Sequence, residues 1–101
     1  MTRNLVVGAA QLGPIQQTDS RQSAVKRMIE LLHQAAAKHC DLVVFPELAL
    51  TTFFPRWFVD DISQADHGYE TEMPSPVTAP LFEEAGHPGM GFASGYADLP
   101  P

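Results

Sequence analysis

A run of four apolar residues, 42–45 (LVVF), is closed by a proline and followed at once by an acidic residue. Its β-branched and aromatic side chains are typical of a strand that is covered on both faces of a sheet. Pro46 has no N–H group to donate to a neighbouring strand, so we expect the strand to end there. Glu47 should therefore leave the sheet at the carboxyl end of the strand, where open α/β sheets place their ligands.

Glu47 is the main candidate for a catalytic residue. It precedes Leu48, Ala49 and Leu50, so we expect its carboxylate to be partly desolvated, and desolvation favours the protonated form. A carboxylate in such surroundings is suited to act as a general base. A glutamate at a strand end is more often a solvated or ion-paired surface group, and these local features alone leave that alternative open.

The sequence before this strand predicts a βαβ unit. Residues 4–11 (NLVVGAAQ) form an apolar block that ends at a Gly-Pro turn signal, and we expect a first strand there. Residues 18–20 (TDS) offer side chains that can cap a helix. Between positions 24 and 40 the apolar residues recur every three or four positions, which predicts an amphipathic helix lying on the sheet. Two strands joined in this way should be parallel.

The remainder of the chain predicts a second helix and a third strand. Residues 77–85 can form a short helix if Pro80 lies in its first turn, and residues 86–88 (GHP) should end it. Residues 90–96 alternate small and large side chains, which fits a strand. Residues 60–72 are acidic and weakly periodic, so we expect a solvated loop or a short helix. The resulting order, βαβαβ, indicates an α/β fold.

Composition argues against several classes of function. The formal net charge of the 101 residues is −6, and the six basic residues form no stripe interleaved with aromatic residues, so we expect no nucleic-acid partner. No apolar run is long enough for a membrane span, and no secretory signal is evident, which predicts a cytoplasmic protein. The single cysteine and the four histidines show no metal-ligand spacing. We therefore expect no metal and no cofactor.

Cys40 and the aromatic segment 51–58 (TTFFPRWF) each have two interpretations. Cys40 could be a nucleophile, but it lies where the first helix should end, with no base beside it, so we expect a small buried thiol. The aromatic segment can wall a substrate pocket, with Phe53 in the wall and Arg56 as partner of a substrate carboxylate. Alternatively, its rings fill the core and Arg56 pairs with a nearby aspartate.

Residues 45–57 (FPELALTTFFPRW) resemble a motif of the nitrilase, or carbon-nitrogen hydrolase, superfamily, and within it most closely the N-carbamoyl-D-amino-acid amidohydrolases. Members of that group have similar sequences where this chain has residues 69–83 (YETEMPSPVTAPLFE) and 89–99 (GMGFASGYADL). The resemblance therefore spans nearly the whole chain in register. It implies a four-layer αββα sandwich, of which residues 1–101 would be an N-terminal part, and a full-length protein that forms homo-oligomers.

The resemblance also implies a Glu-Lys-Cys catalytic triad. Glu47 corresponds by its place in the motif to the general base, whereas Lys26, Lys38 and Cys40 match neither of the other two members. The implied reaction converts a small-molecule substrate, an N-carbamoyl-D-amino acid, to the D-amino acid, ammonia and carbon dioxide. The 101-residue chain alone is expected to be inactive.

Two alternatives to this function remain open. The chain could belong to another enzyme of the superfamily, such as a β-ureidopropionase, an aliphatic amidase or a nitrilase, because substrate choice rests largely on residues further along the chain. It could also be a truncated, non-catalytic product that only binds partners along an exposed sheet edge.

Overall fold

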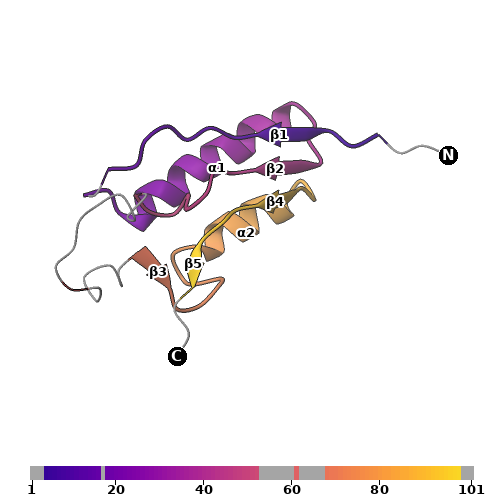
Figure 1. Cartoon of the computed structure of the whole chain (residues 1–101). Helices are drawn as coiled ribbons and strands as arrows, with labels where there is room; N and C mark the ends of the chain where they lie inside the picture. Colours follow the sequence, from indigo (N-terminus) through magenta and orange to yellow (C-terminus); the bar gives the residue numbers. More distant parts are fainter. Residues whose placement is uncertain (1–3, 17, 53–60, 62–67, 99–101) are drawn as a thin grey trace.

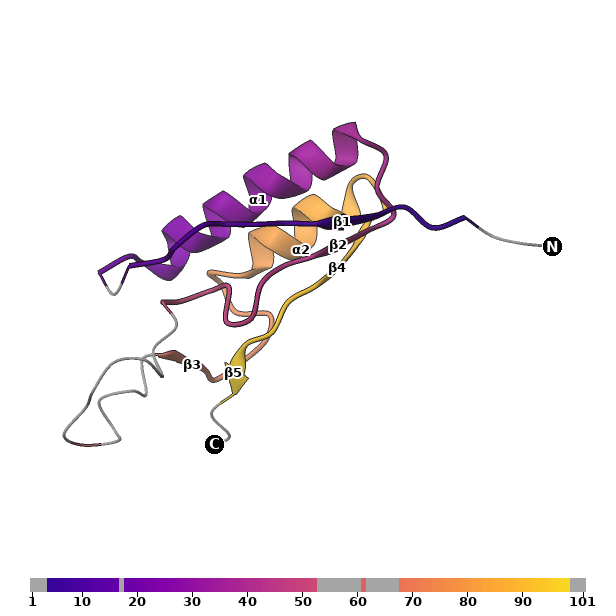
Figure 2. The same cartoon turned by 45° about the horizontal axis from the view of Figure 1, so that its top comes forward.

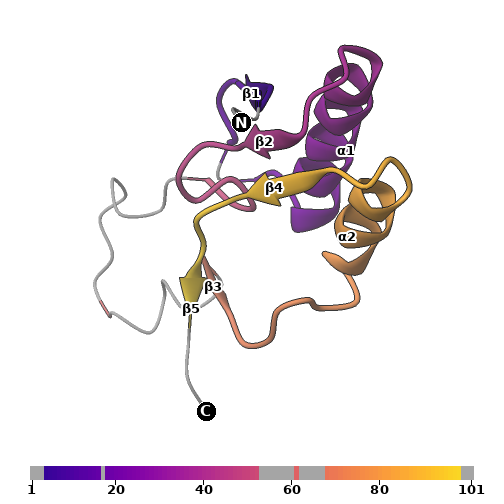
Figure 3. The same ribbon diagram turned by 90° about the vertical axis from the view of Figure 1, so that its right-hand side faces the viewer.

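The structure is a computed structural model that describes residues 4–16, 18–52, 61 and 68–98. These residues form a mixed α/β fold, in which two helices cover one face of a sheet of three parallel strands (Figures 1 and 3). The elements of this layer are β1 (Val7–Ala9), α1 (Arg21–Ala37), β2 (Leu42–Val44), α2 (Ala79–Gly86) and β4 (Gly91–Ala93). Two shorter strands, β3 (Tyr69–Glu70) and β5 (Ala97–Asp98), pair in a separate parallel sheet.

The three-stranded sheet has the order β1-β2-β4, and its register is continuous across the strands. Gly8 lies opposite Val43, and Val43 lies opposite Phe92. Side chains alternate between the two faces of a strand, so these three residues face the helices while their neighbours face the other side. The predicted βαβαβ order is confirmed, with β3 inserted between β2 and α2.

Helix α1 begins and ends with recognisable capping motifs. The Ser20 hydroxyl accepts a hydrogen bond from the N–H of Ser23 at 3.1 Å, which satisfies one of the free donors of the first turn. At the other end His39 adopts a left-handed conformation, with φ of 59°, and the N–H of Cys40 donates to the carbonyl oxygen of Ala35. This is a Schellman motif, which ends the helix at Ala37.

The hydrophobic core lies between α1, α2 and the helix-covered face of the sheet. Met28 and Leu32 of α1 are almost fully buried, as is Val43 of β2. Ridges of apolar side chains at helical spacing thus pack on the central strand, as the sequence predicted. The full cluster of buried residues is Val25, Met28, Leu32, Ala35, Val43, Phe45, Ala49, Leu50, Leu81, Ala85 and Met90.

Helix α2 is present as predicted, although it begins at Ala79 instead of residue 77. Pro80 lies in the first turn, where its missing N–H has no partner to lose, and the helix ends at Gly86. On the surface the side chains of His33 in α1 and Glu84 in α2 approach to 3.0 Å. The hydrogen bond from His33 lowers the pKa of the Glu84 carboxyl group below its usual value.

The strand β3 was not predicted, because residues 60–72 were expected to form a loop or a short helix. Residues 62–67 lie outside the described chain, but Tyr69 and Glu70 form a strand that is tied to α1. The Nε group of Arg21 donates to Oε1 of Glu70 at 2.7 Å, and its Nη2 group donates to the carbonyl oxygen of Tyr69 at 3.0 Å. This pairing allows the Glu70 carboxylate to be buried.

The predicted third strand, residues 90–96, is also shorter than expected. Its ladder with β2 covers only Gly91–Ala93, and the chain then leaves the sheet and continues into β5 (Figure 3). Residues 94–96 are consequently free to lie beside the segment that follows β2. The early end of β4 matters for the candidate site, because Gly95 then lies beside the backbone of Glu47 and Leu48.

Candidate active site

The carboxyl ends of the three parallel strands are held together immediately before Glu47. The N–H of Ala10 donates to the carbonyl oxygen of Val44 at 2.9 Å, and the N–H of Phe45 donates to that of Ala93 at 2.8 Å. Because the strands are parallel, the segments that follow them leave from the same edge of the sheet (Figure 2). Glu47 lies in the middle one of these segments, as the sequence predicted.

The surroundings of Glu47 differ from those predicted. Glu47 is exposed, so the expected partial desolvation by the residues that follow it is wrong for the part of the chain that is described. Ala49 and Leu50 are buried in the core instead of covering the carboxylate. Glu47 lines an open pocket of about 160 Å³. The other lining residues come from the loop after β1 and from the Glu47 segment: Leu12, Gly13, Pro14, Ile15, Pro46, Leu48, Ala49 and Thr51.

Leu48 explains how an exposed residue can be followed by two buried ones. Its φ of 50° is in the left-handed region, which costs a bulky side chain free energy and is uncommon outside glycine and asparagine. The N–H of Thr51 donates to the carbonyl oxygen of Leu48 at 3.4 Å, closing a turn. The chain therefore reverses direction at Leu48, and backbone conformations of this kind are concentrated at functional sites.

Arg27 of α1 holds the loop that forms the opposite wall of the pocket. Its Nη2 group donates to the carbonyl oxygens of Leu12 and Pro14, the latter at 3.2 Å. Gly13, between them, has a φ of 77°, which a glycine adopts without strain. The sequence analysis did not single out Arg27, because its role depends on a loop that lies 13 to 15 positions earlier in the chain.

The segment after β4 lies directly against the backbone at Glu47. A Cβ atom placed on Gly95 would be 3.8 Å from the Cα of Glu47 and 3.8 Å from the nitrogen of Leu48. Both distances are ordinary van der Waals separations, so the two segments lie side by side and an alanine would also fit at position 95. Sequence analysis did not single out Gly95, since a glycine in an expected strand carried no sign of this contact.

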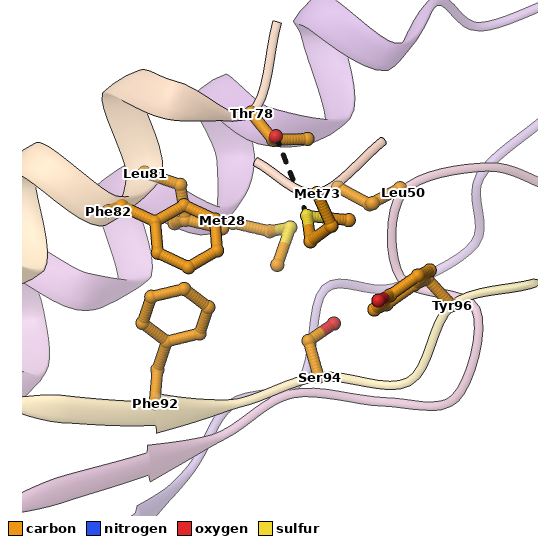
Figure 4. A pocket seen from close by; sticks show the side chains of 9 residues that line it. All are labelled: Met28, Leu50, Met73, Thr78, Leu81, Phe82, Phe92, Ser94 and Tyr96. Atoms are coloured by element: carbon orange, nitrogen blue, oxygen red, sulfur yellow. Dashed lines mark hydrogen bonds between the residues drawn. The ribbon is translucent and has the colours of Figure 1, made fainter. Parts of the chain in front are cut away.

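A small cavity of about 50 Å³ lies beside the same segment (Figure 4). Its walls are largely apolar, and Ser94 and Tyr96 contribute the polar groups of the strand side. The hydroxyl oxygen of Ser94 is buried and has no hydrogen-bond partner among the described residues. The residues that line the cavity are Met28, Leu50, Met73, Thr78, Leu81, Phe82, Phe92, Ser94 and Tyr96.

Replacing Ser94 with alanine is expected to leave the free energy of unfolding unchanged or to raise it by up to about 1 kcal/mol, because a buried hydroxyl without a partner is removed. Thr78→Val is the matched control: the Thr78 hydroxyl accepts a hydrogen bond from the N–H of Ser75 at 2.7 Å, so its loss should cost about 1–3 kcal/mol. Urea unfolding measures both. A Ser94→Ala variant destabilised as much as Thr78→Val would contradict the prediction.

The sequence also matches a known protein family, and this match indicates the class of reaction to which Glu47 could contribute. The sequence model of the family described as carbon-nitrogen hydrolase matches residues 6–99, a range that includes every strand and helix of the structure. The chain belongs to the carbon-nitrogen hydrolase family. The superfamily named on motif grounds is thereby confirmed, and the parallel sheet with its two helices is consistent with the N-terminal part of the family's α/β fold.

The cysteine of this carbon-nitrogen hydrolase, Cys40, and the candidate base, Glu47, lie at opposite ends of the same strand. Cys40 precedes β2, at its amino end, whereas Glu47 follows the carboxyl end of the same strand. Its sulfur packs closely on β1, since a Cβ atom on Gly8 would be only 3.1 Å from it. Cys40 is half-buried, which agrees with a packing role, although it was expected to be more fully buried.

The predicted substrate-binding residues of the hydrolase, Phe53 and Arg56, lie outside the described residues, as does most of the aromatic segment. Within the described ranges, no group of three or more His, Cys, Asp or Glu side chains is placed to hold a metal ion. None of the described helices is long and apolar enough to cross a membrane.

Proposed function

We propose that this chain supplies the general base, Glu47, of a carbon-nitrogen hydrolase that converts N-carbamoyl-D-amino acids to D-amino acids, ammonia and carbon dioxide. The observation that carries the proposal is the position of Glu47 at the open carboxyl edge of three parallel strands, in a chain of this family. The narrower choice of substrate is supported by the likeness of residues 45–57, 69–83 and 89–99 to the N-carbamoyl-D-amino-acid amidohydrolases.

In the proposed reaction Glu47 accepts a proton and returns it in each of two stages. It first accepts the proton of a cysteine thiol, whose sulfur attacks the carbamoyl carbon. The bond between that carbon and the amino-acid nitrogen breaks, and Glu47 returns the proton to the leaving amine. Glu47 then accepts a proton from the water that attacks the carbamoyl carbon, the bond from that carbon to sulfur breaks, and Glu47 returns the proton to the sulfur. The carbamic acid that is released decomposes to ammonia and carbon dioxide. A lysine ammonium group would stabilise the oxyanion in both steps.

These roles need a nucleophile and a lysine that the 101 residues do not place beside Glu47. Within these 101 residues no lysine or cysteine follows Glu47, and Cys40 lies at the opposite end of β2. We therefore propose that residues 1–101 are one part of a catalytic domain and are inactive alone. The first experiment is the intact mass of the protein from its source, for which we expect a value well above 11.0 kDa.

A substrate panel then tests the function. The protein from its source is incubated with N-carbamoyl derivatives of D- and L-amino acids, with β-ureidopropionate, with aliphatic amides and with nitriles, and the release of amino acid and ammonia is measured. We expect turnover to be fastest with the N-carbamoyl-D-amino acids. Preference for β-ureidopropionate, an amide or a nitrile would replace this assignment by another member of the family, and no turnover of any would favour a non-catalytic product.

Arg56 is proposed as the partner of the substrate carboxylate. In the active protein, Arg56→Gln should raise the Michaelis constant roughly tenfold or more with a smaller effect on kcat, because a charge-assisted hydrogen bond contributes about 1.5–3 kcal/mol. Lys26→Gln, which removes one positive charge from an exposed position on α1, is the control and should leave both constants unchanged. An unchanged Michaelis constant in Arg56→Gln would remove Arg56 from the site.

A further inference from the structure

The two walls of the pocket at Glu47 are anchored in different ways. The wall that carries Glu47 is fixed by the core, because Ala49 and Leu50, which follow it in the chain, are buried there. In the facing wall, residues 12–15, no residue is fully buried, and only Leu12 packs against the hydrophobic core. The position of the facing wall therefore depends mainly on polar contacts.

The polar contacts of the facing wall come from one side chain. The loop starts at the end of β1 and closes at Gln16, whose N–H donates to the carboxylate of Asp19 at 2.8 Å. Between these two points, the hydrogen bonds that the structure describes for residues 11–15 are the two from Arg27. Arg27 is thus the principal restraint on this wall of the pocket.

The geometry of the contact suits Arg27 to hold a single loop conformation. Its Nη2 atom donates to the carbonyl oxygens on both sides of Gly13, which has a φ of 77°. Arg27 forms no ion pair with another described residue, so these carbonyl groups are its observed partners. Hydrogen bonds from a charged donor are stronger than those between neutral groups. Loss of Arg27 should therefore release the loop while Glu47, which is anchored separately, stays in place.

Charge indicates which part of a substrate can enter this pocket. Glu47 is the one charged residue among the described residues that line it. The Glu47 carboxylate would repel the carboxylate of an N-carbamoyl amino acid, whereas it would not repel the uncharged carbamoyl group. Residues 12–15 therefore face the carbamoyl end of the substrate, which is the end at which Glu47 is proposed to act.

We propose that Arg27 is a positioning residue, which holds residues 12–15 against the carbamoyl group and so sets the affinity for the substrate. This inference rests on the function proposed above. If the loop is in place for only about a tenth of the time, the substrate binds about tenfold more weakly. Once the substrate is bound the loop is in place, and Glu47 reacts as before. Loss of Arg27 should thus raise the Michaelis constant and leave kcat nearly unchanged.

The kinetics of Arg27→Gln in the active protein test this inference. We expect a Michaelis constant raised by about tenfold or more, with kcat within about threefold of its original value. The rise should be the same for N-carbamoyl derivatives of small and large D-amino acids, because the loop faces the end that they share. Arg27→Lys, which keeps a charged donor, should recover part of the affinity.

Lys26→Gln is the matched control for these kinetics. It removes the same charge from the preceding, exposed position of α1 and should change neither constant. A purely structural role of Arg27 would lower the fraction of folded protein, which lowers kcat and leaves the Michaelis constant unchanged. That result would overturn the inference, and circular dichroism of each variant measures the folded fraction directly.

Limited proteolysis tests the placement of the loop without relying on turnover. Thermolysin cleaves before large apolar residues, and cleavage before Leu12 requires the loop to leave its place on Arg27. This cut should be severalfold faster in Arg27→Gln than in Lys26→Gln, and equal rates would overturn the inference.

The outcomes also separate this inference from the proposed function. If Glu47→Gln retained turnover, the proposed function would fail. If Glu47→Gln lost turnover while Arg27→Gln kept a normal Michaelis constant, only the role of Arg27 would fail.

Discussion

Glu47→Gln is expected to lower the turnover of an N-carbamoyl-D-amino acid by about 10²–10⁴-fold, which is the contribution typical of a positioned general base. Glutamine keeps the size of the side chain but cannot accept the proton of a thiol or of water. Glu47 is exposed and forms no ion pair with the other described residues, so the unfolding transition should stay where it is. The measurement is kcat of the protein from its source, together with its urea unfolding curve.

Glu83→Gln is the control for this loss of activity. Glu83 is an exposed residue of α2, and its replacement makes the same chemical change away from the carboxyl edge of the sheet. This variant should retain full turnover. If Glu47→Gln retained turnover as well, Glu47 would not be the base, and if both variants lost it, the effect would come from a general disturbance of the fold.

Leu32→Ala is expected to lower the free energy of unfolding by about 2–5 kcal/mol. Leu32 is 1% exposed and lies in the core between α1 and the central strand, so the shorter side chain leaves a cavity and loses its contacts. Domains of this size have a total stability of about 5–15 kcal/mol, so the loss is a large part of the whole. Urea unfolding measures the change.

The neighbouring Leu31→Ala provides the comparison. Leu31 is in the same helix and undergoes the same chemical change, but it is only partly buried beside the open edge of β1. Its replacement should therefore cost clearly less than that of Leu32. Equal costs at the two positions would mean that the core does not lie on the face of α1 that the structure assigns to it.

The spacing of apolar residues and the positions of prolines predicted the main layer of the fold well. The apolar spacing of α1, the strand of β2 closed by Pro46 and the position of Pro80 in the first turn of α2 are local features, and each is present in the structure. They depend on residues within one or two turns of each other, so the sequence carries them directly. The placement of Glu47 at the carboxyl edge of the sheet follows from the same features.

The parts that were missed depend on contacts between distant residues. Strand β3 is held by Arg21, 49 positions before Glu70, and no local pattern marks such a pair. Arg27 resembles any other polar residue of an amphipathic helix until the loop after β1 is placed beside it. The exposure of Glu47 depends on the backbone conformation of Leu48, a residue type that gives no indication of a left-handed turn.

That conformation has a consequence for attempts to stabilise this protein by directed evolution. Glycine adopts a φ near 50° without steric cost, so a library selected only for thermal resistance should be enriched in substitutions at position 48. The same substitutions would loosen the turn that separates Glu47 from the buried residues after it. Selections on this scaffold should therefore retain leucine at position 48, or screen for turnover alongside heat tolerance.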